Sequence, residues 1–378
     1  MRLSAIATVL LLSTSGAAFA QNLDALTQAL DHLPEFILTN PDDPIQARFV
    51  DVSALFALPG LAGEEAKREN LLRLQVGSGL YPVDALFRNE LADWQERAGI
   101  SLSEVQYFVG LASPPNVIAL WGMETDADAA TFFDTLKQHD FVPFGGDDGV
   151  LGNGEPMKID FDKRDPANPW RSSMGAATFV ATKGNAIVQA SSPAAVPVLL
   201  NDGPSVADNP IVATALKGLD QSVGDGWIVQ AMLISPAFGM GGFDLADLVS
   251  LQPGNLDELR SKLESQIAGL SEGIPPYFGG IIADVQLENP AVAIALTYAD
   301  CDTAEAAARQ IGGRWKASMP ETAQGTITTT HGEGVDGLCA ALFTVVGDTE
   351  DPTTNPIFGR FFEQYMRRDF TVLQVGNA

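Results

Sequence analysis

The sequence predicts a mixed α+β fold made of two related halves, each an antiparallel sheet with helices on one face. Three features predict it: short apolar segments bounded by turn residues, longer stretches with apolar residues at helical spacing, and an order of segments that recurs later in the chain. The 378 residues are 46% hydrophobic and include 20 Phe, which is enough to bury a sizeable core.

A predicted strand pair followed by a helix defines the unit that recurs. Residues 105–111 and 117–123 are apolar segments separated by a turn that contains Pro114 and Pro115. Thr125 or Asp126 is a suitable cap for the helix that follows. The predicted buried face of this helix has the spacing i, i+3, i+4, i+7 and consists of Ala129, Phe132, Phe133 and Leu136.

The same order of segments is found in the second half of the chain. Residues 280–286 and 292–298 are apolar and flank a turn with Asn289 and Pro290, and Asp302 is the predicted cap of the next helix. The predicted buried face of that helix consists of Ala304, Ala307, Ala308, Ile311 and Trp315.

A shift of 175 positions aligns the two units without a gap. It places Pro115 on Pro290 and Leu136 on Ile311. The alternative is coincidence, because any two α+β segments align once gaps are allowed. We interpret the correspondence as a tandem duplication, with a first half at 21–200 and a second half at 201–378.

Each half has further elements around this unit. Strands are expected at 45–53 and 227–235, each after a helix, at 23–33 and from Asn209-Pro210. Helices are also expected at 64–74, 83–98, 255–270 and after Asn355-Pro356, and strands at 178–182, 186–190, 325–330, 338–346 and 370–375.

Residues 1–20 have the pattern of a secretory signal peptide. Met1 and Arg2 are followed by an apolar run at 3–12 and by Ala18-Phe19-Ala20, so cleavage leaves Gln21 first. The run is too short for a helix that spans about 30 Å of hydrocarbon. Because no Cys is at the cleavage point, we expect no lipid anchor. The sequence therefore predicts a soluble periplasmic or secreted protein.

The charge balance excludes some classes of partner. The chain has 48 acidic and 22 basic residues and a formal net charge of −26, which disfavours nucleic acid and anionic lipid surfaces. The longest apolar run after the leader, 281–299, is interrupted by Asp284, Glu288 and Pro290. We therefore expect no membrane span in the mature chain.

Cys301 and Cys339 are the two cysteines of the chain. In an oxidising compartment, a pair of cysteines favours a disulfide. The alternative is a reactive thiol, but neither Cys is part of a Cys-x-x-Cys motif or has a histidine near it in the sequence.

An acidic segment at 145–175 has no counterpart in the second half and is the largest insertion. Asp160, Asp162 and Asp165 are its candidate metal ligands, since flexible carboxylates suit calcium. Their spacing does not match an EF-hand, and Lys163 and Arg164 supply counter-charges, so a solvated loop is the alternative. No other cofactor is predicted.

Trp170 is the candidate partner contact, because it lies among prolines in a segment without periodicity. The alternative interpretation is an aromatic ring that covers the edge of the core.

No familiar catalytic motif is present. His32, His139 and His331 have no acid or nucleophile at a recognisable spacing. The sequence therefore predicts a non-catalytic binding or interaction module of the cell envelope. The expected partner is an envelope protein or a small molecule, and a ligand is expected between the halves or under the 145–175 insertion. The alternative is a carboxylate-based or metal-assisted hydrolase with its site under that insertion.

Overall fold

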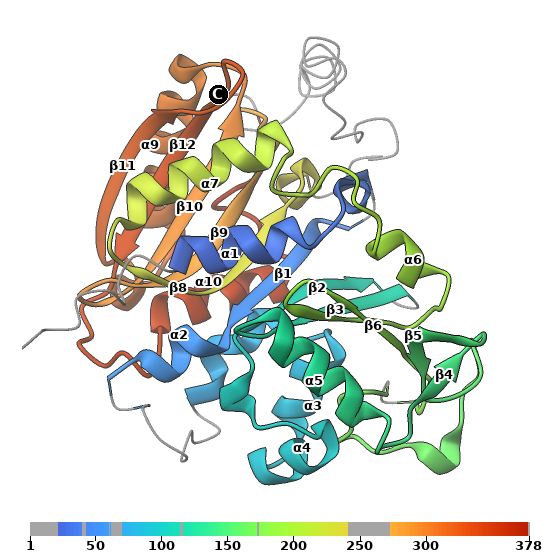
Figure 1. Cartoon of the computed structure of the whole chain (residues 1–378). Coiled ribbons are helices and arrows are strands. Elements are labelled where there is room, and N and C mark those ends of the chain that lie inside the picture. Colours follow the sequence, from blue (N-terminus) through green and yellow to red (C-terminus); the bar gives the residue numbers. More distant parts are fainter. Residues whose placement is uncertain are drawn as a thin grey trace, which may run out of the picture.

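A computed structural model of the chain is shown in Figure 1. It describes residues 22–39, 43–59, 61, 70–113, 116–171, 174–240 and 273–376. The predicted signal peptide at 1–20 and the predicted helix at 255–270 lie outside the described residues.

One antiparallel sheet of twelve strands, counted over the described residues, forms the centre of the molecule. In chain order the strands are β1 (Ile45–Asp51), β2 (Tyr107–Ser113), β3 (Asn116–Gly122), β4 (Val142–Phe144), β5 (Asp147–Gly152), β6 (Phe179–Lys183), β7 (Ala186–Ala190), β8 (Trp227–Ile234), β9 (Gly279–Gln286), β10 (Pro290–Tyr298), β11 (Thr326–Glu333) and β12 (Cys339–Val346). Across the sheet their order is β11-β12-β10-β9-β8-β1-β2-β3-β7-β6-β5-β4.

The two halves of the chain share this sheet. β1 and β8 pair in antiparallel fashion at its centre, where Phe49 lies opposite Ala231 and Arg48 opposite Met232. The mixed α+β class and the antiparallel pairing agree with the sequence-based expectation. We expected a separate sheet in each half. The structure has one continuous sheet instead, because β1 of the first half pairs with β8 of the second and leaves no free edge between them.

The strand order is the same in both directions from this central pair. Outward from β1 it is β1-β2-β3-β7-β6, and outward from β8 it is β8-β9-β10-β12-β11. β5 and β4 extend the sheet on the N-terminal side alone. β4 comes directly before the insertion at 145–175, and β5 lies within it.

Helices cover both faces of the sheet. The α-helices are α1 (Asn22–Asp31), α2 (Val52–Ala57), α3 (Tyr81–Arg88), α4 (Leu91–Ala98), α5 (Asp126–Leu136), α6 (Ala195–Leu199), α7 (Pro210–Val223), α9 (Cys301–Ser318) and α10 (Pro356–Met366). Short 3-10 helices are η1 (Glu35–Thr39), η2 (Asn70–Gly77), η3 (Leu102–Glu104), η4 (Phe161–Lys163), η5 (Pro236–Gly239) and η7 (Glu321–Ala323).

The expectation that helices lie on one face is wrong. Gly218 of α7 lies against Leu342 of β12, whereas Trp315 of α9 packs on Phe343, the next residue of the same strand. Successive side chains of a strand point to opposite faces, so α7 and α9 are on opposite sides. The reason is that every residue of β10 is buried, so both faces need a cover.

Several helix starts match their sequence signals. Thr125 caps α5 and Asn209 caps α7, each by accepting a backbone N–H from the first turn. The cap of α9 is Asp300 and not Asp302, because the Asp300 carboxylate accepts the Thr303 N–H at 2.8 Å.

Other predicted boundaries differ from the structure. The helix expected at 83–98 is two helices, α3 and α4, which are separated by Asn89 and Glu90. The strand expected at 370–375 is mostly turn, with a single bridge between Val375 and Ile274. The insertion contains β5 and η4, where we expected irregular structure alone.

Asp51 at the end of β1 is a fully buried helix cap. Its carboxylate accepts the Ala54 N–H at 2.7 Å and the Ser53 hydroxyl at 2.8 Å, and so begins α2. Burial outweighs these hydrogen bonds and raises the pKa of Asp51 to about 6. Because this pKa lies above that of the unfolded chain, the carboxyl favours the folded state most at low pH. This favourable contribution is lost as the pH rises through about 6.

The Asp51→Asn variant tests this charge. An amide keeps the cap without a buried charge, so we expect it to raise the free energy of unfolding at pH 7.5 by up to about 3 kcal/mol, the value of a shift of about two pKa units. At pH 4 the variant and the original chain are expected to be equally stable. Urea unfolding at both pH values measures the difference, and a variant that is less stable at pH 7.5 contradicts the assignment.

Candidate functional site

A buried ion pair joins the two halves of the chain on one face of the sheet. Arg73 of η2 and Asp284 of β9 are 2% and 0% exposed, and they are 211 residues apart in sequence. The Arg73 Nε donates to Asp284 Oδ2 at 3.2 Å, and its Nη2 donates to Oδ1. This bidentate geometry is the strong form of an arginine–carboxylate contact.

Three amide side chains complete the network. Gln230 Nε2 donates to Asp284 at 3.0 Å and Asn355 Nδ2 donates to it at 2.7 Å. The Arg73 Nη1 donates to the Gln286 side-chain oxygen and to the Pro352 carbonyl, each at 2.7 Å. The elements linked in this way are η2, β8, β9 and the start of α10. We call these five side chains (Arg73, Gln230, Asp284, Gln286 and Asn355) the central polar network.

The network satisfies its charges internally. The Asp284 carboxylate accepts two hydrogen bonds from Arg73 and one each from Gln230 and Asn355. These four hydrogen bonds engage both oxygens of the carboxylate, which is 0% exposed. The central polar network therefore has the chemistry of a structural clamp.

Two cavities flank this clamp. One of about 200 Å³ lies between η2 and the start of α10, and its wall includes Arg73, Asp284 and Asn355. The second is larger, about 480 Å³, and its lining includes Gln286 of the network and Pro352, whose carbonyl accepts from Arg73. Its lining residues are Pro59, Val223, Asp225, Gly226, Trp227, Gln286, Leu287, Glu288, Glu350 and Pro352.

The larger cavity, which we call the junction cavity, combines apolar and acidic groups. Trp227 and Leu287 are partly exposed in it, and Asp225, Glu288 and Glu350 are exposed carboxylates. None of its described lining residues is basic. An aromatic ring beside carboxylates suits a cation that carries an apolar body.

The candidate metal ligands of the insertion are placed as follows. Asp160 accepts the Asp162 N–H at 3.2 Å and caps η4, and Asp165 forms an ion pair with Arg97 at 2.7 Å. Within the described part of the chain, no three His, Cys, Asp or Glu side chains form a group that would hold a metal ion. The calcium site at Asp160, Asp162 and Asp165 therefore stays a prediction, and these three carboxylates do not form a metal-binding group in the described part of the chain.

The cavity under the insertion measures about 300 Å³ and has both signs of charge. Lys158, Lys163 and Arg171 line it together with Glu155 and Asp160. It therefore does not concentrate the negative charge that a calcium site needs.

Trp170 lies in the core and not on the surface. It is 2% exposed and stacks on Trp121 at a centroid distance of 4.2 Å, and its Nε1 donates to the Ala98 carbonyl at 3.0 Å. The expectation that Trp170 contacts a partner is therefore wrong, because the buried ring is inaccessible to a partner. The alternative interpretation, an aromatic ring that belongs to the core, describes it.

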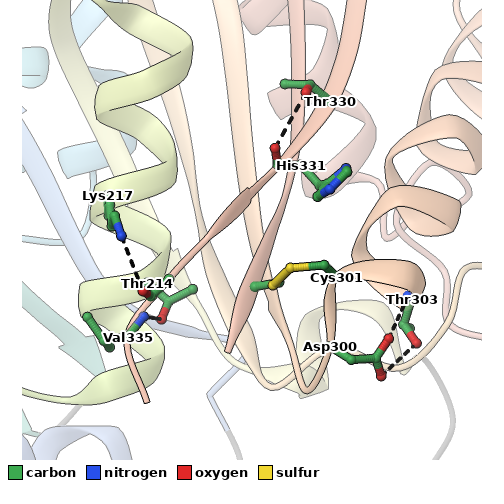
Figure 2. Close-up of a disulfide and its surroundings, with 10 residues drawn as sticks. Thr214, Lys217, Asp300, Cys301, Thr303, Thr330, His331 and Val335 are labelled. Carbon is green, nitrogen blue, oxygen red and sulfur yellow. Dashed lines mark hydrogen bonds between the residues drawn. A yellow bond between two sulfur atoms is a disulfide. The ribbon is translucent and has the colours of Figure 1, made fainter. Parts of the chain in front are cut away.

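The predicted disulfide between Cys301 and Cys339 is present, with the two Cα atoms 5.0 Å apart. It joins the start of α9 to the start of β12 (Figure 2). The three histidines lie on separate elements. His32 follows α1 and its Nδ1 is 2.9 Å from the Tyr107 hydroxyl, His139 follows α5, and His331 is on β11.

Sequence reasoning missed Arg73, Gln230 and Asn355 as members of one group. The available signal was Asp284, a charged residue within an apolar strand. A buried carboxylate needs a partner, but spacing does not identify one 211 residues away.

Comparisons with protein-family models, with curated proteins and with solved structures find no match for this chain. Over the described residues, no helix is long and apolar enough to cross a membrane.

Replacement of Arg73 by Met tests the clamp. The variant leaves the Asp284 charge buried without its main partner, so we expect the free energy of unfolding to fall by about 3–5 kcal/mol. Urea unfolding at neutral pH measures it. The control is Arg88→Met, which removes an exposed ion pair with Asp84 and is expected to cost below about 1 kcal/mol. Equal losses in the two variants contradict the role of Arg73.

Proposed function

We propose that this protein is a non-catalytic binding module of the cell envelope, and that its ligand occupies the junction cavity. The observation that carries the proposal is the position of this 480 Å³ cavity, beside the clamp that fixes the two halves of the chain. Its volume is in the range of small-molecule sites. The clamp supplies a rigid wall, which limits the ordering that a ligand has to cause.

The proposed ligand is a small organic cation, such as an amine with an aromatic or aliphatic body. Trp227 and Leu287 would contact the body, and Glu288 and Glu350 would attract the charge. The net charge of −26 adds a long-range attraction for cations.

A non-catalytic role is supported by the state of Asp284, the carboxylate in the wall of the smaller cavity. Asp284 is 0% exposed, and its oxygens are engaged by Arg73, Gln230 and Asn355. An envelope location is supported by the leader-like sequence at 1–20 and by the disulfide, which persists in oxidising compartments.

We also propose that the two halves arose by tandem duplication. The support is the strand order, which is the same outward from β1 and from β8, and the matching places of α5 and α9 after β3 and β10. Superposition of β2, β3 and α5 on β9, β10 and α9 at the 175-residue offset tests this origin. Units that fail to superpose at that offset would exclude it.

Calorimetric titration with benzylammonium, and with benzoate as the matched anion, tests the proposed ligand class. We expect benzylammonium to bind and benzoate to give no heat of binding. Glu288→Gln is expected to weaken benzylammonium binding by about tenfold, which corresponds to ~1.4 kcal/mol.

Glu124→Gln is the control for this titration, because Glu124 is an exposed carboxylate that does not line the junction cavity. It is expected to leave the affinity unchanged. Equal binding of the two ligands, or no binding of either, would exclude the proposed site.

A further inference from the structure

The two edges of the sheet differ in how they are protected. The β4 edge is three residues long, contains Pro143 and has a register shift at Phe144, all of which hinder further pairing. The β11 edge is eight residues long, contains no proline or lysine and pairs with β12 without a register shift. Among the described residues, no strand pairs with the outer side of β11.

The hairpin after β11 shows which backbone groups face outward. Gly334 N–H donates to the Leu338 carbonyl at 2.8 Å, and these residues continue the β11–β12 register. In antiparallel pairs, residues that bond to the partner strand alternate with residues that point away from it. Four residues of β11 therefore direct both N–H and C=O to the open edge: Ile327, Thr329, His331 and Glu333.

The β11 edge is held in a fixed conformation. At one end the disulfide ties Cys339, which lies opposite Glu333, to Cys301 of α9. Further along, Gly312 of α9 lies against Thr329, close enough that an added Cβ would be 3.0 Å from the Thr329 methyl carbon. Figure 2 shows Thr330 and His331 on this strand near the disulfide. A rigid strand loses little conformational freedom when it pairs.

We propose that the open edge of β11 pairs with β11 of a second copy of this chain, antiparallel and with a two-fold axis at Thr330. This register uses all four outward residues of both copies, because Thr329 pairs with His331 of the second copy and Ile327 pairs with its Glu333. Eight backbone hydrogen bonds result, two for each of the four pairs.

The side chains of the edge fit this register. Thr330 faces its own counterpart, and cross-strand Thr–Thr pairs are favourable. Glu333 is the one carboxylate in β11, and it faces Ile327 of the second copy, so no like charges are opposed.

The charges on α9 favour a second copy as the occupant. Glu305 and Arg309 precede Gly312 by seven and three residues, so they share its stripe of the helix on the β11 side. They form an ion pair with each other. α9 runs antiparallel to β11, from Cys301 near Glu333 to Gly312 near Thr329, which places this ion pair at the level of Thr330 along the strand, on the face opposite to the Thr330 side chain. The two-fold axis would then bring Glu305 of each copy toward Arg309 of the other.

Single cysteine variants test the proposed register. At the axis, Thr330 of the two copies forms a pair that is not hydrogen-bonded, with Cα atoms about 4.5 Å apart, a separation that a disulfide spans. Thr330→Cys is therefore expected to give a cross-linked dimer under mild oxidation. Thr328→Cys is the matched control on the same exposed face, since its two copies would be four residues out of register, about 13 Å apart.

Non-reducing electrophoresis measures the cross-linked fraction. Cross-linking of Thr330→Cys well above that of Thr328→Cys supports the proposal. Equal cross-linking, or none in either variant, overturns it.

A proline variant tests the edge independently of disulfide chemistry. Thr329→Pro removes an outward N–H and leaves the β12 pairing intact, so we expect dimerisation to weaken at least tenfold without loss of the monomer fold. Thr329→Ala keeps the N–H and is expected to dimerise as the original chain does. Sedimentation velocity measures the association and circular dichroism the fold. A chain that stays monomeric in solution, or a dimer that Thr329→Pro does not weaken, overturns the proposal. Neither result depends on the junction cavity.

Discussion

The bidentate contact between Arg73 and Asp284 is the interaction on which the arrangement of the molecule depends. Arg73 reaches the sheet from η2, in the N-terminal half, and Asp284 lies in β9, two strands beyond the central β1–β8 boundary. Loss of its partner destabilises a buried charge far more than it destabilises an exposed charge. The contact therefore fixes where η2 lies on the sheet. Gln230 and Asn355 extend the same constraint to β8 and α10.

This fixed arrangement determines where functional surfaces can lie. With the halves fused through one sheet and covered on both faces, open surface is left at the ends of the strands and at the sheet edges. The junction cavity is at such an end, where the start of β8 and the end of β9 meet the segment before α10. β11 is the unprotected edge. The proposed ligand site and the proposed dimer contact therefore use separate surfaces of the molecule.

Local features of the fold could be predicted from the sequence, and long-range ones could not. Thr125 and Asn209 cap helices because capping needs a side chain and an N–H a few residues away. The disulfide was predictable because Cys301 has a single cysteine to pair with. The β1–β8 pairing was missed, because the residue pattern of an apolar strand does not show which other strand it pairs with. Trp170 was ambiguous, since its burial depends on Trp121, 49 positions earlier, and on packing that spacing does not encode.

A double-mutant cycle between Arg73 and Asp284 tests the central claim most directly. The free energy of unfolding is measured by urea titration for Arg73→Met, for Asp284→Asn, for the double variant and for the original chain. The claim predicts that the two substitutions are strongly non-additive, with a coupling energy of about 2–3 kcal/mol, the upper range for groups in direct contact. Additivity within about 0.5 kcal/mol would contradict it, because that is the behaviour of sites that do not interact.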